Sequence, residues 1–92
     1  LNSTATLNGF DGISANGGSI NNCAALGNAA NGIDGTNTAV MNSMGVENGS
    51  NGIAVGFGAV SFCTATLNNL RADGSVDIRA DSSARTGNLP AP

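Results

Sequence analysis

The residues that most often carry chemistry in proteins are few in this sequence, and their spacing does not form an active site. There is no His and no Lys among the 92 residues, and the charged side chains are three Arg and six Asp or Glu. Without His, a Ser or Cys nucleophile lacks its ordinary general base. Asp11, Asp34 and Glu47 stand beside turn-forming residues and share no motif, so a glycosidase-like carboxylate pair is not indicated. We therefore predict that the protein is not an enzyme.

The two cysteines, Cys23 and Cys63, are the remaining groups with metal or redox chemistry. Two Cys without His and without a Cys-x-x-Cys pair do not supply a structural zinc site. We predict no metal and no cofactor. In a secreted chain two Cys usually form one disulfide, and the spacing of the elements that carry them decides whether this pair can meet.

A period of twenty residues organises the chain. The sequence TATLN at 4–8 returns at 64–68, and Gly-Ile pairs recur at 12–13, 32–33 and 52–53. In rows of twenty the eighth column is always Asn, namely Asn8, Asn28, Asn48, Asn68 and Asn88. The third column alternates Ser and Cys as Ser3, Cys23, Ser43, Cys63 and Ser83. We predict one domain, 1–92, with repeats 1–20, 21–40, 41–60 and 61–80 and a partial repeat 81–92. Asp73-Gly74 lies two places later in its row than the preceding Asn-Gly and Asp-Gly pairs, which indicates a small insertion in the fourth row.

Composition favours a stack of repeats over a globule with a large core. The chain has no Trp, no Tyr, three Phe and 14 Gly, so large side chains are scarce for a domain of this size. Only 10% of residues are charged and the net charge is −3, unlike a typical disordered chain. Asn-Gly and Asp-Gly pairs predict turns, with short β runs at 3–7, 36–40, 53–55, 59–66 and 75–78. We predict an all-β fold, a β-solenoid-like stack of about four and a half 20-residue strand-turn-strand-turn coils.

In such a stack, residues of one column lie about 4.8 Å apart. The Asn column then forms a ladder of side-chain amides, although Asn at these positions is equally explained by turn geometry alone. Cys23 and Cys63 fall two coils apart, so their Cα atoms would be separated by about twice 4.8 Å, whereas a disulfide needs roughly 4.4–6.8 Å. Three outcomes stay open: an intrachain disulfide in a less regular fold, buried thiols, or a bond between chains.

The Asn- and Gly-rich rows resemble the subunits of bacterial functional amyloids of the curlin type, whose repeats are strand-turn-strand units of about twenty residues. The resemblance covers roughly residues 1–70 and is architectural, since this chain lacks the Gln column and the Ser-x5-Gly pattern of curlin repeats. Locally, NGIAVGFGAV at 51–60 is similar to the head repeats of trimeric autotransporter adhesins. Both resemblances imply a secreted protein that works at a cell surface.

The charge pattern restricts the partners. Three Arg in the last quarter, interleaved with Asp, do not fit nucleic-acid binding, and no apolar run is long enough to span a membrane. The sequence begins at Leu1 rather than Met, and we expect a processed, secreted, extracellular chain. Its first β run carries no charge or Pro that would guard a sheet edge, and it consists of Ser3, Thr4, Ala5, Thr6 and Leu7.

We therefore predict a structural protein that binds copies of itself through strand contacts, in an extracellular filament or adhesive surface resembling a pilus or functional amyloid. Donor-strand exchange is a variant that would come with an intrachain disulfide. The alternative is a monomeric solenoid that binds a ligand, of the ice-binding type, because Thr-x-Thr occurs at 4–6 and 64–66. A surface or glycan ligand stays undefined.

Overall fold

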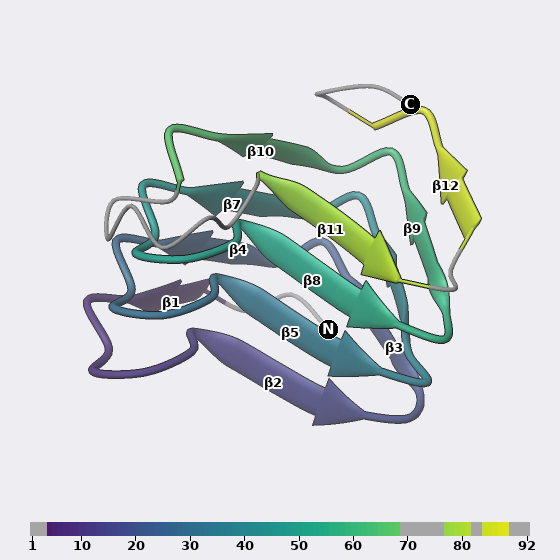
Figure 1. Ribbon diagram of the computed structural model, residues 1–92, viewed down its shortest axis with the longest axis horizontal. Helices are drawn as coiled ribbons and strands as arrows, with labels where there is room; N and C mark the ends of the chain where they lie inside the picture. Colours follow the sequence, from purple (N-terminus) through teal and green to yellow (C-terminus); the bar gives the residue numbers. More distant parts are fainter. Residues whose placement is uncertain (1–3, 69–76, 82–83, 89–92) are drawn as a thin grey trace.

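The computed structural model describes residues 4–68, 77–81 and 84–88, which form a stack of short parallel strands without any helix (Figure 1). The predicted all-β solenoid is confirmed. Each coil, however, contains three strands rather than two, so the stack has three sheets around a narrow interior. The described chain makes about three full turns from the first strand of each sheet to the fourth, which is fewer than the predicted four and a half coils.

Each sheet contains one strand from every coil, and all neighbouring strands are parallel. Sheet A contains β1 (Thr4–Thr6), β4 (Ala24–Leu26), β7 (Met44–Val46) and β10 (Thr64–Thr66). Sheet B contains β2 (Ile13–Asn16), β5 (Ile33–Thr36), β8 (Ile53–Gly56) and β11 (Ile78–Asp81). Sheet C contains β3 (Ser19–Asn21), β6 (Ala39–Met41), β9 (Ala59–Ser61) and β12 (Ala84–Thr86). We number the coils one to four in the same order.

The strand register shows where the period holds and where it changes. Thr4 pairs with Ala24 and Met44 pairs with Thr64, so sheet A keeps steps of twenty residues. In sheet B, Ile53 pairs with Ile78, a step of 25, and sheet C makes the same change between β9 and β12. The insertion therefore has five residues and lies between β10 and β11. As a result, β11 crosses the boundary that rows of twenty would place after residue 80.

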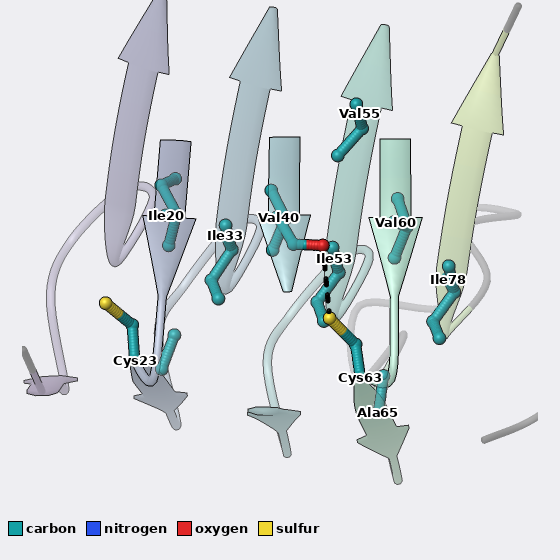
Figure 2. Packing of buried hydrophobic residues seen from close by; sticks show 11 residues of the cluster. Ile20, Cys23, Ile33, Val40, Ile53, Val55, Val60, Cys63, Ala65 and Ile78 are labelled. Atoms are coloured by element: carbon teal, nitrogen blue, oxygen red, sulfur yellow. Dashed lines mark hydrogen bonds between the residues drawn. The ribbon is translucent and has the colours of Figure 1, made fainter. Parts of the chain in front are cut away.

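The core is built from columns of small and β-branched side chains that alternate with outward residues along each strand. Sheet B contributes Ile33, Ile53 and Ile78, while sheet C contributes Ile20, Val40 and Val60, and all six are buried (Figure 2). Burial of such a side chain stabilises a fold by roughly 1.5–3 kcal/mol. Because aromatic residues are scarce, the repeated columns of Ile and Val supply most of the hydrophobic burial.

The corners of the coil depend on left-handed residues. The first residue after each strand of sheet A has positive φ, and Leu7, Gly27, Glu47 and Leu67 form this corner column. Equivalent columns are Gly17, Asn37 and Phe57 after sheet B, and Asn22, Asn42, Phe62 and Gly87 after sheet C. Asn-Gly and Asp-Gly pairs favour turns because both residues tolerate positive φ, but among the described pairs only Gly17 adopts positive φ. The turn predicted at Asp34-Gly35 is wrong, because this pair lies inside β5.

Candidate functional site

The predicted Asn ladder exists over four coils and follows the loop between sheets A and B. The Oδ1 atom of Asn28 accepts bonds from the backbone N–H and the Nδ2 of Asn8, at 3.1 and 2.8 Å. Asn48 accepts the same pair from Asn28, both at 2.9 Å, and Asn68 accepts the pair from Asn48, also at 2.9 Å. Side-chain amides and backbone together therefore connect each coil to the next.

The buried ladder amides are fully satisfied. Asn48 has no exposed surface, and its Nδ2 donates a second bond to the carbonyl of Ala25 at 3.1 Å. With two bonds accepted at Oδ1 and two donated from Nδ2, the amide uses its whole hydrogen-bonding capacity. Asn at this column is thus required for its side-chain bonds and not for turn geometry, because no ladder residue among the first four has positive φ.

Asn88 does not belong to this ladder. The five-residue insertion shifts it into the column of the cysteines, where its Oδ1 accepts the backbone N–H of Cys63 at 2.9 Å and its Nδ2 donates to the carbonyl of Val60 at 2.8 Å. The ladder ends instead on Asp77, whose Oδ1 accepts the backbone N–H and the Nδ2 of Asn68 at 3.1 and 2.9 Å. Ser83, the residue that rows of twenty place in the cysteine column, lies outside the described residues.

The glycines of the Gly-Ile column make room for the ladder. A Cβ atom on Gly12, Gly32 or Gly52 would lie only 2.4–2.5 Å from the Nδ2 of the ladder amide one coil above. None of the three has positive φ. Their small size, rather than their conformational freedom, explains why the column repeats every twenty residues.

A second ladder, which sequence reasoning missed, follows the other side of the same loops. Asp11 Oδ1 accepts the backbone N–H of Asn31 at 2.9 Å, and Asn31 Oδ1 accepts the backbone N–H and the Nδ2 of Asn51 at 3.1 and 3.0 Å. Its donors lie on the later coil, whereas the donors of the first ladder lie on the earlier coil. The available signal was the polar residue that precedes each Gly-Ile pair.

Both cysteines are buried thiols two coils apart, and neither is in a disulfide (Figure 2). The Sγ of Cys63 lies 3.3 Å from the carbonyl of Ser61 and 3.6 Å from that of Val40, and Cys23 contacts the carbonyl of Asn21 at 3.4 Å. Ser43, between them in the column, donates to the carbonyl of Met41 at 2.9 Å. At Cys23, Ser43 and Cys63 the column therefore carries a small side chain that donates to the carbonyl two residues earlier. Burial raises the pKa of the Cys63 thiol, which lowers its reactivity.

The structure brings two carboxylates together that the sequence left unrelated. Asp34 lies on the outer face of β5, and burial together with the charge and the hydrogen bond of Asp11 raises the pKa of Asp34. In the described part of the chain, no group of three or more His, Cys, Asp or Glu side chains could hold a metal ion.

The predicted edge run lies at the end of sheet A. Thr4, Ala5 and Thr6 form β1, Leu7 follows at the corner with an exposed side chain, and Ser3 lies outside the described residues. The free side of β1 has no strand beside it among the described residues. The candidate site is therefore the edge of the first coil that no described strand covers, together with the ladder residue Asn8.

No known family model matches the chain, and no curated protein matches it significantly. Over the described residues there is no helix that could cross a membrane.

Proposed function

We propose that the protein is an extracellular structural protein that joins further copies of itself coil upon coil, in a filament or an adhesive surface. The observation that carries the proposal is the outer edge of the first coil, beside which no strand lies among the described residues. Its three strands, β1, β2 and β3, each lie at the end of a sheet. They contain no charged residue, although charges are the usual protection of an exposed edge.

The polar groups of the first coil support the same proposal. In the inner coils each ladder Oδ1 accepts two bonds from the coil before it, but the Oδ1 of Asn8 accepts none from the described residues. The backbone of sheet A also bonds to the preceding coil: the N–H of Met44 donates to the carbonyl of Cys23, and the N–H of Thr64 donates to the carbonyl of Ser43. Thr4 has the same register position as Met44 and Thr64, so its N–H is directed at the place of a preceding coil.

The fourth coil offers a matching surface in sheet A. Strand β10 repeats the sequence of β1, so a second copy placed there would set Thr64 under Thr4, whereas Asn68 already donates to Asp77 and would not extend the amide ladder. Such a head-to-tail contact is heterologous and produces an open polymer. The fourth strands of sheets B and C, β11 and β12, both contain charged residues, which disfavour pairing at a sheet edge. We therefore expect sheet A, whose last strand β10 is uncharged, to provide most of the contact.

Ice binding receives less support from the outer face of sheet A. Thr4, Thr6, Thr64 and Thr66 lie on the first and fourth strands, while the strands between them present Ala24, Leu26, Met44 and Val46. Regular Thr rows would have to continue through β4 and β7 to give an ice-matching surface.

The experiment compares Thr4→Pro with Thr4→Val by negative-stain electron microscopy and sedimentation at neutral pH. Pro removes the edge N–H, whereas Val retains it and keeps a β-branched side chain. We expect filaments from the natural sequence and from Thr4→Val, and discrete particles from Thr4→Pro. Discrete particles from the natural sequence that persist for days, or filaments from all three proteins, would overturn the proposal.

A further inference from the structure

The corner between sheet A and the following loop carries a groove with apolar walls and one carboxylate. On the sheet A side a hollow of about 350 Å³ is lined by Leu7, Leu26, Gly27, Val46 and Glu47 among others. On the loop side a second hollow of about 510 Å³ shares Gly27 and Glu47 and is bordered by Phe10. The two hollows therefore meet at the corner column.

The walls of this groove are unusually exposed for apolar side chains. Leu7 and Phe10 are 84% and 82% exposed, and Leu26 is also exposed. Gly27 lies between Leu7 and Glu47 in the corner column, and its missing side chain creates the notch that joins the hollows. Gathered apolar side chains around a concave surface are characteristic of interaction sites rather than of ordinary protein surface.

The charge of the groove selects among ligands. Glu47 is exposed and forms no ion pair with the described residues, and residues 1–70 contain no Arg, Lys or His at all. With Asp11 and Asp34 the first three coils are uniformly acidic. An anionic lipid surface would be repelled, whereas an apolar segment with a cationic side chain would match both the walls and the carboxylate.

We propose that this groove binds a partner protein through a segment in which a lysine is flanked by apolar residues. The lysine ammonium pairs with Glu47 while the flanking side chains cover Leu7 and Phe10. This inference stands apart from the proposed stacking, because the groove lies on the side of the solenoid whereas the stacking uses the strand edges of the end coils.

The test titrates the protein with capped tripeptides, acetyl-Leu-Lys-Leu-amide and acetyl-Leu-Gln-Leu-amide, and follows binding by NMR. We expect the lysine peptide to bind about two- to fivefold more tightly, the usual effect of an ion pair with an exposed carboxylate. Glu47→Gln should abolish this preference. Leu7→Asn should weaken both peptides, since Asn tolerates the left-handed corner while it removes an apolar wall.

Leu67→Asn is the matched control, because Leu67 occupies the same corner column with similar φ but does not line either hollow. It should leave both affinities unchanged. Equal binding of the two peptides, or a lysine preference that survives Glu47→Gln, would contradict the proposal. So would self-association of the protein that Glu47→Gln or Leu7→Asn abolishes, because the occupant would then be a second copy of the chain.

Discussion

The aromatic ring of Phe62 lies against Gly87 on the next coil, so closely that a Cβ atom on Gly87 would be 2.6 Å from the ring. Leu7 and Gly27 show the same relationship less tightly, since a Cβ atom on Gly27 would lie 3.3 Å from the Leu7 side chain. In both pairs the larger residue and the glycine have positive φ. Large apolar residues at the corners are therefore accommodated by glycine one coil later, although they remain largely exposed.

No glycine of the described residues lies against Phe57 in this way. It has φ of 58° and is 67% exposed, and Asn37 occupies the same column one coil earlier with φ of 52°. Since a left-handed conformation costs most residues roughly 1–2 kcal/mol and Asn less, we expect Phe57→Asn to raise the free energy of unfolding by about 0.5–1 kcal/mol. Urea unfolding followed by circular dichroism measures this change. A loss of stability would show that the Phe57 ring makes a contact worth more than the strain.

The Asn ladder should contribute unequally along its length. Asn48→Ala removes a fully bonded, buried amide and leaves the donors of Asn28 without their acceptor. We expect a loss of roughly 3 kcal/mol or more, because each unsatisfied buried group costs about 1–3 kcal/mol. Asn8→Ala, at the exposed end of the ladder, should cost under about 1 kcal/mol. Thermal unfolding of both variants checks the contrast, and equal losses would contradict it.

Two glycines with ordinary φ but different surroundings provide a test of the space argument. A Cβ atom on Gly32 would collide with Asn48 Nδ2 and with the carbonyl of Gly52, whereas one on Gly9 would have no atom within 4 Å. Gly32→Ala should therefore destabilise the fold by about 2 kcal/mol or more. Gly9→Ala should be neutral or slightly stabilising, since it reduces the entropy of the unfolded chain. Comparable denaturation midpoints for the two variants would refute the interpretation.

The carboxylate pair predicts a pH dependence with a defined sign. Burial and the neighbouring Asp11 raise the pKa of Asp34 above its ordinary value of 3.8. Folding thus favours the protonated form of Asp34. The stability that this protonation contributes is fully present below about pH 3.8 and is lost as pH rises through the raised pKa of the folded state. We expect Asp34→Asn, which still donates to Asp11, to be more stable than the natural sequence at pH 7.

The difference between Asp34→Asn and the natural sequence should shrink toward pH 3. Unfolding titrations from pH 3 to pH 7 measure it, with Glu47→Gln as a control for the loss of one negative charge elsewhere. An Asp34→Asn variant that is less stable at pH 7 would show that the carboxylate makes a favourable contact in its ionised form.

The sequence predicted the solenoid and its register because both depend on repetition, which columns of Asn and Gly-Ile make visible. The third strand of each coil was not predicted, since its corners have only two residues and are hidden in continuous β runs. The run at 59–66, for example, contains β9, the corner at Phe62 and Cys63, and β10. Asn88 was misplaced because a fixed period cannot locate a five-residue insertion.

The outward-facing surface along the side of the solenoid was the part least predictable from the sequence. Left-handed Leu7 and Phe57 violate the usual residue preferences for such corners, so no pattern indicated that their side chains would be exposed. The Asp11–Asp34 contact joins a loop to the neighbouring coil and becomes visible only when the register is known.

The constant step between neighbouring strands of the first three coils has a consequence for how such a chain can change length. Removal of residues 21–40 would bring β1 beside β7 with each inward residue in its original column, with left-handed residues at the corners of sheet A, and with Asn8 next to Asn48 in the amide ladder. A deletion or duplication of twenty residues therefore preserves the cross-section of the solenoid, whereas a change of nineteen would require a loop to absorb one residue, as the loop between β10 and β11 absorbs five. Whole coils are the natural unit in which this molecule can be shortened, lengthened or redesigned.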